Sequence, residues 1–359
     1  MPTHLDTRTL NRATLARQHL LDRTATPVLD LIAHLGGLQA QLPQEPFTGL
    51  CSRVAGFEPD MVSQPLEGRS LARLHLMRRT VHLVTAEDAR QWRPRHHTLL
   101  RQRTTATYRR ELADVDLDEL AAAARTLMAD GQPRSLGEIG RAVAQRWPQA
   151  SPRALGETVV AALVPMVQIP PRGTWASNGG AFYRLIEDWL GPAGHDGAAD
   201  EHDLAGQAMV KRYLAAFGPA TTSDLRAWCG LAGLPAAVRA VRNELISFRD
   251  PRGRELLDLP DAPRPEPDTP APVRFLPAFD NAVLGFHDRS RMIDDHFRPL
   301  SVTGARFVLV DGRVAGTWTT AETAVMVTPL RPLTKAEQTA VEEEAQQLTD
   351  FFRKWTPSA

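Results

Sequence analysis

The chain has 359 residues, of which 43% are hydrophobic, and its 42 basic residues balance its 42 acidic residues to a formal net charge of zero. This composition is typical of a globular protein with about two to four buried cores. No apolar run approaches the roughly 18 residues that span a membrane, and the start of the chain lacks the apolar stretch of a secretory signal, so we expect a cytoplasmic protein. Cys51 and Cys229 lie far apart without a CxxC pair, which argues against a zinc site or a disulfide framework.

The first 110 residues are expected to form helices, strands and a cationic belt. The runs LNRATLARQHLL, TPVLDLIAHLGG and EPDMVSQPLEG have helical spacing, and SLARLHLM and RTVHLVT are prone to form strands. Between Arg73 and Arg110 there are ten arginines and four histidines against only two acids, Glu87 and Asp88. Arginines at that density can follow a phosphate backbone, although a solvated helix face carries the same pattern.

A pattern of three helices and a hairpin follows, and it is typical of a winged helix. In residues 116–191 an amphipathic helix and two further helices, opened by Ser135 and Ser151, precede two short β-prone runs around RGTWASNGG. In residues 203–260 the order returns, with AAVRAVRNELISFRD as the last helix and a turn before the strand RELLDLP. We interpret the first 85 residues as a diverged third copy.

The remainder of the chain is expected to be rich in strands. The proline-rich, acidic stretch DAPRPEPDTPAP connects rather than folds. Beyond it VRFLPAF, AVLGFH, ARFVLVDGRVAGTW and AVMVTPL are predicted strands, with a tight turn at Asp311 and Gly312, and a charged helix from Thr334 to about Trp355 closes the chain. The sequence therefore predicts an α+β protein of four parts, at residues 1–112, 113–195, 196–262 and 263–359.

The segment HLGGLQAQLPQEPF, residues 34–47, contains the side chains to which we assign the chemistry. Its two glycines break a helix, and Pro43 and Pro46 forbid a new one, so Gln39 and Gln41 are expected on irregular or extended backbone. At a spacing of two, their carboxamides project from one side of an extended chain. Such a pair can hold one water or grip sugar and phosphate oxygens, but it can also serve only to satisfy the amides of a turn.

Three motifs together resemble one known family. The QAQ after HLGGL, the run RRTVHLVTAEDARQW and the later FLPAFDNAVLGFHDRS are similar to the AlkZ/YcaQ superfamily of winged-helix DNA glycosylases, over nearly the whole chain. The resemblance implies three tandem winged helices that form a C-shaped clamp around double-stranded DNA. It also implies that Gln39, Ala40 and Gln41 occupy the catalytic motif. A glutamine in place of an acid at the last position implies the branch associated with resistance to bulky, crosslinking natural products.

The resemblance implies a monofunctional glycosylase for N7-alkylated purines, including bulky adducts and interstrand crosslinks, that gives self-resistance to a genotoxic natural product such as azinomycin. An N7-alkylated guanine is cationic and departs readily, so a placed water and stabilisation of an oxocarbenium-like sugar suffice, without a metal or another cofactor. We assign Gln41 to the attacking water and Gln39 to that water or to the deoxyribose, and the order of these roles stays open. A lyase needs an amine nucleophile, and no lysine precedes Lys211.

Further residues are expected to contact DNA from the cationic belt, from the wing RGTWASNGG and from GFHDRS, a segment that the resemblance places at the DNA channel. A turn cap and a surface ion pair would explain the Asp288 and Arg289 pair equally well. The polar cluster at residues 195–203 contains side chains of metal-ligating type, but its flexible spacing favours a linker, and we expect no metal. The predicted DNA contacts are Arg78, Arg79, His82, Arg172, Trp175, Asp280, His287, Asp288 and Arg289.

Two other classes of protein share parts of this pattern. A winged-helix regulator would dimerise and read DNA without chemistry, and a drug-sequestering resistance protein would bind the free toxin. The predicted helices LGETVVAALVPM and AAVRAVRNELI expose little of the arginine, asparagine or glutamine chemistry that reads bases. We therefore expect an enzyme, monomeric and associated with the nucleoid, and release of free alkylated base from damaged DNA distinguishes the three classes.

Overall fold

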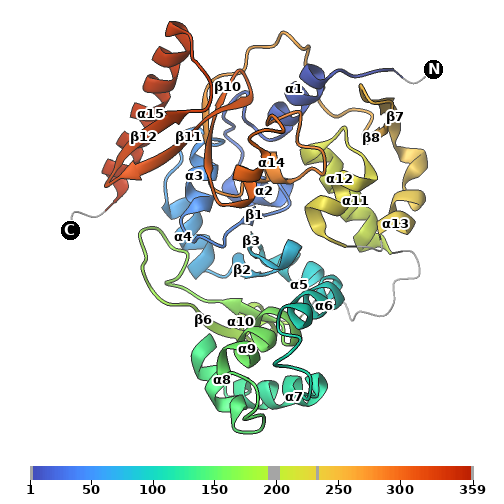
Figure 1. Cartoon of the computed structure of the whole chain (residues 1–359), viewed down its shortest axis with the longest axis vertical. Helices are drawn as coiled ribbons and strands as arrows, with labels where there is room; N and C mark the ends of the chain where they lie inside the picture. Colours follow the sequence, from blue (N-terminus) through green and yellow to red (C-terminus); the bar gives the residue numbers. More distant parts are fainter. Residues whose placement is uncertain (1–2, 193–202, 232–233, 357–359) are drawn as a thin grey trace. The chain divides into compact units, whose positions relative to one another are not determined.

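The computed structural model describes residues 3–192, 203–231 and 234–356, and this part of the chain has an α+β fold of two compact units. Unit 1 combines residues 1–61 with residues 200–359, and unit 2 consists of residues 62–199. In Figure 1 unit 1 runs through blue and then through yellow to red, and unit 2 runs through cyan to green. Among the described helices, none is both long and apolar enough to cross a membrane. The finer division into four parts, with winged-helix units, stays a prediction.

Unit 1 takes its helices from both of its chain segments. Polar side chains cap several of them: Asp6 accepts from the Thr9 amide at 2.7 Å at the start of α1, and Thr221 and Thr334 form capping boxes. A further helix, α4 (Asp60–Glu67), crosses the boundary between the units. The helices of unit 1 are α1 (Thr7–Arg17), α2 (Val28–His34), α3 (Glu45–Cys51), α11 (Leu204–Phe217), α12 (Thr222–Cys229), α13 (Leu234–Ala240), α14 (Asn281–Leu284) and α15 (Lys335–Trp355), with short turns η3 (Arg242–Glu244) and η4 (Arg298–Val302).

The strands of unit 1 include a four-stranded antiparallel sheet in the order β12-β11-β10-β9. Phe307 of β10 lies opposite Thr317 of β11 and Leu276 of β9. A tight turn at Asp311 and Gly312 joins β10 to β11, as predicted. β7 and β8 form a separate antiparallel hairpin. The strands are β1 (Leu38–Gln39), β7 (Ile246–Arg249), β8 (Glu255–Asp258), β9 (Arg274–Leu276), β10 (Arg306–Val310), β11 (Arg313–Ala321) and β12 (Ala324–Pro329).

Helix α1 makes contacts that join the two chain segments of unit 1. Arg17 pairs with Asp258 of β8 at 2.6 Å, and both side chains are fully buried. Asn11 donates to the Gly312 carbonyl at 2.8 Å. The Arg17–Asp258 pair and the Asn11 hydrogen bond therefore connect the N-terminal segment of unit 1 to its C-terminal segment.

Unit 2 contains five strands in one sheet, in the order β3-β2-β5-β6-β4, and a group of helices. Val167 of β5 lies opposite Arg184 of β6 in an antiparallel pair, which confirms the predicted hairpin around RGTWASNGG. The strands are β2 (Leu71–His75), β3 (Val81–Thr85), β4 (Arg134–Ser135), β5 (Met166–Gln168) and β6 (Phe182–Leu185). The helices and helical turns are η1 (Met77–Arg79), α5 (Ala86–Arg95), α6 (His97–Thr107), α7 (Leu117–Met128), α8 (Leu136–Ala144), α9 (Pro152–Thr158), η2 (Val159–Leu163) and α10 (Ile186–Leu190).

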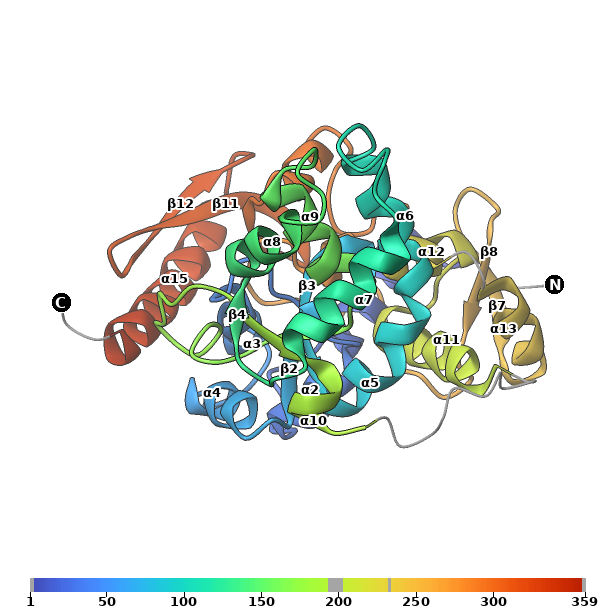
Figure 2. The ribbon, with the colours of Figure 1, turned by 90° about the horizontal axis from the view of Figure 1, so that it is seen from below.

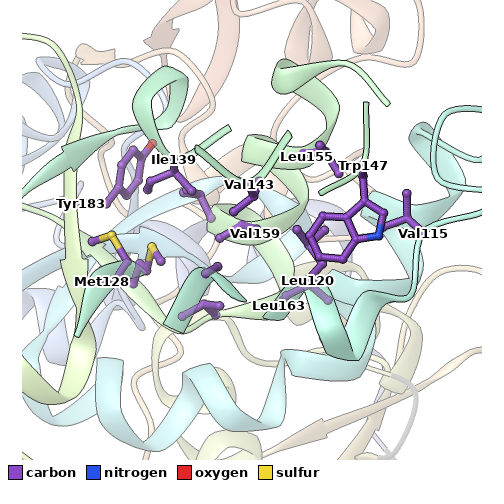
Figure 3. Packing of buried hydrophobic residues seen from close by; sticks show 14 of the residues in the cluster. Val115, Leu120, Met128, Ile139, Val143, Trp147, Leu155, Val159, Leu163 and Tyr183 are labelled. Atoms are coloured by element: carbon purple, nitrogen blue, oxygen red, sulfur yellow. The ribbon is translucent and has the colours of Figure 1, made fainter. Parts of the chain in front are cut away.

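Helices α7, α8 and α9, which are labelled in Figure 2, contribute buried side chains to one hydrophobic core in unit 2. The π-helical turn η2 contributes Val159, Val160 and Leu163 to the same core. Figure 3 shows Trp147 and Val143 among the buried side chains of this core. Helices α8 and α9 approach each other closely, because a Cβ on Gly140 would lie only 2.0 Å from the carbonyl oxygen of Pro152. The predicted starts of these helices at Ser135 and Ser151 are confirmed, since both hydroxyls accept a backbone amide of the first turn.

Three sequence-based expectations about secondary structure are wrong. AVLGFH begins with helix α14 and is not a strand, because Asp280 caps its first turn through the Ala282 amide at 2.7 Å. The end of the predicted helix AAVRAVRNELISFRD is strand β7, since its β-branched and aromatic residues pair with β8. Pro46 does not forbid a helix, because it lies in the first turn of α3, where no partner for its missing amide hydrogen is needed.

Candidate active site and DNA contacts

The glutamine loop, residues 35–44, connects α2 to α3 in unit 1. Leu38 and Gln39 are extended and the residues that follow are irregular, as predicted. Burial alternates along the loop: Leu38 is 8% exposed and Ala40 is 0% exposed, whereas Gln39 is partly exposed and Gln41 is exposed. Because side chains alternate between faces along extended backbone, this pattern supports both carboxamides lying on the face directed away from the core.

A Schellman motif at the end of α2 fixes the start of the glutamine loop. Gly36 and Gly37 have φ angles of +66° and +84°, which other residues rarely adopt. The Gly37 amide donates to the Ile32 carbonyl at 2.9 Å, and the Gly36 amide donates to the Ala33 carbonyl at 3.1 Å. These bonds satisfy the last carbonyls of the helix and set the direction in which the chain leaves it.

Two side chains from distant parts of unit 1 meet this pair of glycines. A Cβ on Gly36 would lie 2.6 Å from Cζ2 of Trp228, so the indole ring of α12 covers that glycine. The Nδ2 of Asn281, in α14, donates to the Gly37 carbonyl at 3.4 Å. Sequence reasoning missed both contacts, because no spacing rule relates α12 or α14 to a loop near the start of the chain. The similarity of FLPAFDNAVLGFHDRS to the glycosylase family was the only sequence signal for Asn281.

The segment FLPAFDNAVLG, residues 275–285, is termed the brace because it links the glutamine loop to α3. The backbone amide of Ala278 donates to the Glu45 carboxylate at 2.6 Å. The Arg53 guanidinium donates to both oxygens of Asp280, at 2.8 and 2.9 Å, and these side chains are 1% and 3% exposed respectively. Asp280 is therefore part of the buried structure, and we leave it out of the proposed DNA contacts.

The tripeptide His287, Asp288 and Arg289 follows the brace in unit 1. The His287 side chain is exposed, while its backbone amide donates to Asp224 at 2.9 Å and its carbonyl accepts from Arg298 at 3.2 Å. Arg289 donates to the Ser301 hydroxyl at 2.6 Å and is not paired with Asp288. The backbone of this tripeptide is thus held by neighbouring side chains, while the His287 side chain is exposed.

Asp288 links the tripeptide to the β7–β8 hairpin. Its carboxylate pairs with Arg252 at 3.0 Å and with Arg254, and it accepts from the Ser290 amide at 3.0 Å. Although burial opposes ionisation, the hydrogen bonds from Ser290 and Arg254 lower the pKa of Asp288 to about 2. Asp288 therefore stays negative and orients the two arginines. Because a carboxylate repels phosphate, we leave Asp288 out of the proposed DNA contacts. A cavity of about 200 Å³ beside them is lined by Thr7, Leu10, Asp224, Asp250, Pro251, Arg252, Arg254, Leu256, Asp288, Ser290 and Arg291.

Arg78 and Arg79 form the tip of the β2–β3 hairpin in unit 2. Their φ angles are +57° and +64°, and the Thr80 amide donates to the Met77 carbonyl at 3.1 Å, which is a type I′ turn. Such turns favour Asn-Gly, because a residue with a Cβ costs roughly 1–2 kcal/mol in the left-handed region. Strained positions of this kind cluster at functional sites, which supports the predicted role of both arginines in DNA binding.

The predicted contact residue His82 is 0% exposed in unit 2. Its Nδ1 donates to the Thr80 carbonyl at 3.0 Å, and its buried Nε2 has no hydrogen-bond partner among the described residues. Burial and the charge of Arg78 hold the pKa of His82 well below its usual value. Burial, with the charges of Arg93 and Arg79, likewise lowers the pKa of the neighbouring His75 to about 4. Both imidazoles are neutral at pH 7, and we leave His82 out of the proposed DNA contacts.

The loop between β5 and β6 holds Arg172 and Trp175, both partly exposed. Arg172 donates to the Gly179 carbonyl at 3.0 Å, and the backbone amide of Trp175 donates to the Ser63 hydroxyl at 3.1 Å. The loop is thus tied back to its own unit, while part of each side chain stays accessible.

No group of three or more histidine, cysteine, aspartate or glutamate side chains that could hold a metal ion occurs in the described part of the chain. The polar cluster at residues 195–202 lies outside the described residues. The one member that is described, Asp203, caps the start of α11 through the Gly206 amide at 3.1 Å.

Comparisons with known proteins decide the family. Residues 32–351, which include the glutamine loop and the brace, match the family described as DNA glycosylase AlkZ-like. The chain belongs to the AlkZ-like DNA glycosylase family. An interstrand DNA cross-link repair glycosylase from Streptomyces sahachiroi is 25% identical over 352 residues, and the match covers 92% of each chain. The solved structure of the Streptomyces sahachiroi DNA glycosylase AlkZ is 21% identical, with a TM-score of 0.78 over 98% of each chain, so the AlkZ fold is shared.

Proposed function

We propose that this AlkZ-like glycosylase hydrolyses the N-glycosidic bond of N7-alkylated purines in DNA, including bulky adducts and interstrand crosslinks. The glutamine loop carries the proposal, because its burial pattern directs Gln39 and Gln41 away from the core on a loop whose start is fixed. The cross-link repair activity in the name of the Streptomyces relative supports crosslinked DNA as a substrate. Self-resistance to a genotoxic natural product is the corresponding biological role.

The leaving group decides what the two glutamines must supply. Alkylation at N7 makes the purine cationic, so the bond between the base and the sugar breaks as its electron pair moves onto the base. Gln41 then orients the water that attacks the anomeric carbon, and Gln39 holds that water or the deoxyribose. Each carboxamide offers two donors and an acceptor, and fixed dipoles of this kind stabilise the developing charge without a general base. The proton of the attacking water passes to solvent.

The lysines support simple hydrolysis rather than lyase action, which needs a neutral amine to attack the sugar. Lys211 pairs with Glu244 at 2.6 Å. The Nζ of Lys354 lies 4.4 Å from the ring centroid of Trp355, near the end of α15. Lys335 is the first residue of α15. None of the three lysines belongs to the glutamine loop or to the brace, and the enzyme is accordingly monofunctional on this proposal.

On this proposal a monomer binds DNA through four arginines, one tryptophan and one histidine. The type I′ turn and the β5–β6 loop supply the contacts of unit 2, and the tripeptide after the brace supplies those of unit 1, where Asp288 orients neighbouring arginines. Contacts to phosphates give an affinity that does not depend on sequence and that weakens with salt. The contact residues are Arg78, Arg79, Arg172, Trp175, His287 and Arg289.

The proposal is tested by incubating the protein with duplexes that carry N7-methylguanine, a bulky N7 adduct or an N7-linked interstrand crosslink, followed by chromatography of the released bases. We expect free alkylated base, an intact abasic strand and no adduct after borohydride treatment. Binding to DNA without base release, as in a regulator, would contradict the proposal. Binding of the free alkylator without action on DNA would indicate a sequestering protein instead, and a borohydride-trapped complex would refute the monofunctional mechanism.

A further inference from the structure

Two side chains in unit 1 contact the glutamine loop just before Gln39. Asn281 is 5% exposed, and its Nδ2 donates to the Gly37 carbonyl at 3.4 Å. Trp228 is 0% exposed, and its ring occupies the space that a Cβ on Gly36 would need. The two glycines have left-handed backbone, and glycine has no Cβ to restrict its conformation, so contacts from outside the loop add to the Schellman hydrogen bonds in holding one conformation.

The brace holds Asn281 in place. The preceding residue, Asp280, forms the buried bidentate ion pair with Arg53, just after α3, and this pair fixes the first turn of α14. The backbone of Ala278 binds Glu45, the first residue of α3. Because α3 begins where the glutamine loop ends, the brace holds both ends of that loop.

Trp228 is fixed by aromatic neighbours and by the far end of the same brace. Its ring centroid lies 5.2 Å from that of Tyr213 and 6.0 Å from that of Phe217. The Tyr213 hydroxyl donates to the Gly285 carbonyl, the last residue of the brace, at 2.8 Å. The indole therefore has little freedom to move away from the glutamine loop.

We propose that Asn281 and Trp228 are positioning residues that hold the peptide groups of Gly36 and Gly37, and through them direct Gln39 and Gln41 toward the substrate. The inference rests on the proposed function, because it takes the two glutamines as the catalytic residues. Displacement of a catalytic group by about 1 Å costs on the order of a hundredfold in rate, so a loop that begins on two flexible residues gains most from such contacts. Neither positioning residue itself contacts the substrate.

Replacement of Asn281 by Ala tests the inference. Single-turnover release of N7-methylguanine should fall by about tenfold to a hundredfold, since the loop samples misdirected conformations, while the Kd for the same duplex stays within about twofold. Amide hydrogen exchange should accelerate in peptides that cover residues 35–44 and stay at the wild-type rate in α1. Asn243→Ala, at an exposed asparagine of η3 in the same unit, is the matched control and should match the wild type in every measurement.

A double-mutant cycle with Gln41→Ala separates positioning from general destabilisation. If Asn281 acts through Gln41, Asn281→Ala should slow the residual excision much less in the Gln41→Ala background than in the wild type. Equal factors in both backgrounds, or wild-type rates and exchange in Asn281→Ala, overturn the inference. Trp228→Phe should give a smaller loss of the same kind, because it retains part of the ring.

The outcomes also distinguish failure of this inference from failure of the proposed function. Wild-type excision by Gln41→Ala refutes the proposed function itself. Slow excision by Gln41→Ala together with wild-type excision by Asn281→Ala refutes only the positioning role. If Asn281→Ala does not fold, Asn281→Ser replaces it in the same cycle, because serine is well tolerated at the start of a helix and is too short to reach the Gly37 carbonyl.

Discussion

The ion pair between Asp280 and Arg53 allows a quantitative test of the brace. In Asp280→Ala the Arg53 guanidinium stays buried but loses both carboxylate bonds, and it retains the Gly49 carbonyl, which lies 2.8 Å from its Nη1. Removal of one partner of a buried pair costs about 3–5 kcal/mol, and the retained acceptor favours the lower end of that range. A loss of about 3 kcal/mol lowers the Tm of a unit of this size by roughly 6–12 °C.

The assay combines thermal melts and urea unfolding of the full chain with DNA-binding titrations at several salt concentrations. Asp295→Ala, at an exposed aspartate of unit 1, is the control and should leave stability unchanged. Below its Tm, Asp280→Ala should bind undamaged duplex with the wild-type salt dependence. A variant with the wild-type Tm and a changed affinity would refute this reasoning and would make Asp280 a DNA contact. The double variant Arg53→Met/Asp280→Leu should recover part of the lost stability, because it leaves no unpaired charge.

Three further predictions concern DNA binding, pH and metals. Arg78→Gly/Arg79→Gly should keep the type I′ turn and change the free energy of unfolding by no more than about 1 kcal/mol, because glycine relieves the left-handed strain. In anisotropy titrations of DNA binding, the slope of log K against log salt should become shallower by about 1.8, or about 0.9 per lost phosphate contact. An unchanged slope would remove both residues from the DNA surface. The urea midpoint of unfolding should be constant above about pH 6.5 and should fall as the pH is lowered from there to about pH 4. In this range His75 takes up a proton in the unfolded chain but not in the folded chain, where its pKa is about 4. His75→Gln should therefore reduce the fall. Base release should be unchanged in EDTA, because a cationic leaving group needs no Lewis acid, and activity that is lost in EDTA and restored by zinc would contradict the mechanism.

Local signals predicted those parts of the fold that depend on residues close together in the sequence. The capping residues Ser135, Ser151 and Thr334 begin helices where expected, and Asp311 with Gly312 forms the expected turn. The run AVLGFH was misread because a short, mostly apolar segment has no periodicity that separates a buried helix from a buried strand.

Contacts over long sequence distances account for most of what the sequence did not predict. The Arg17–Asp258 pair, which joins the two segments of unit 1, connects residues whose local patterns carry no information about each other. The same holds for the candidate site. The two glycines predicted the irregular loop of Gln39 and Gln41, but the hydrogen bond from Asn281 to that loop spans 244 residues. Resemblance to the family indicated that these segments belong to one site, and packing in the structure shows how they are joined.

Single-turnover release of N7-methylguanine by Gln41→Ala tests the central claim most directly. We expect release to fall by about two orders of magnitude, comparable to the loss of one preorganised catalytic hydrogen bond, with the Tm and the DNA affinity unchanged. Gln39→Ala should behave similarly, and the double variant should be much less impaired than the product of the two effects, because both amides serve one water. Gln338→Ala, at an exposed glutamine of α15, is the matched control. A stable, DNA-binding Gln41→Ala variant that releases the base at the wild-type rate would contradict the assignment of catalysis to the glutamine loop.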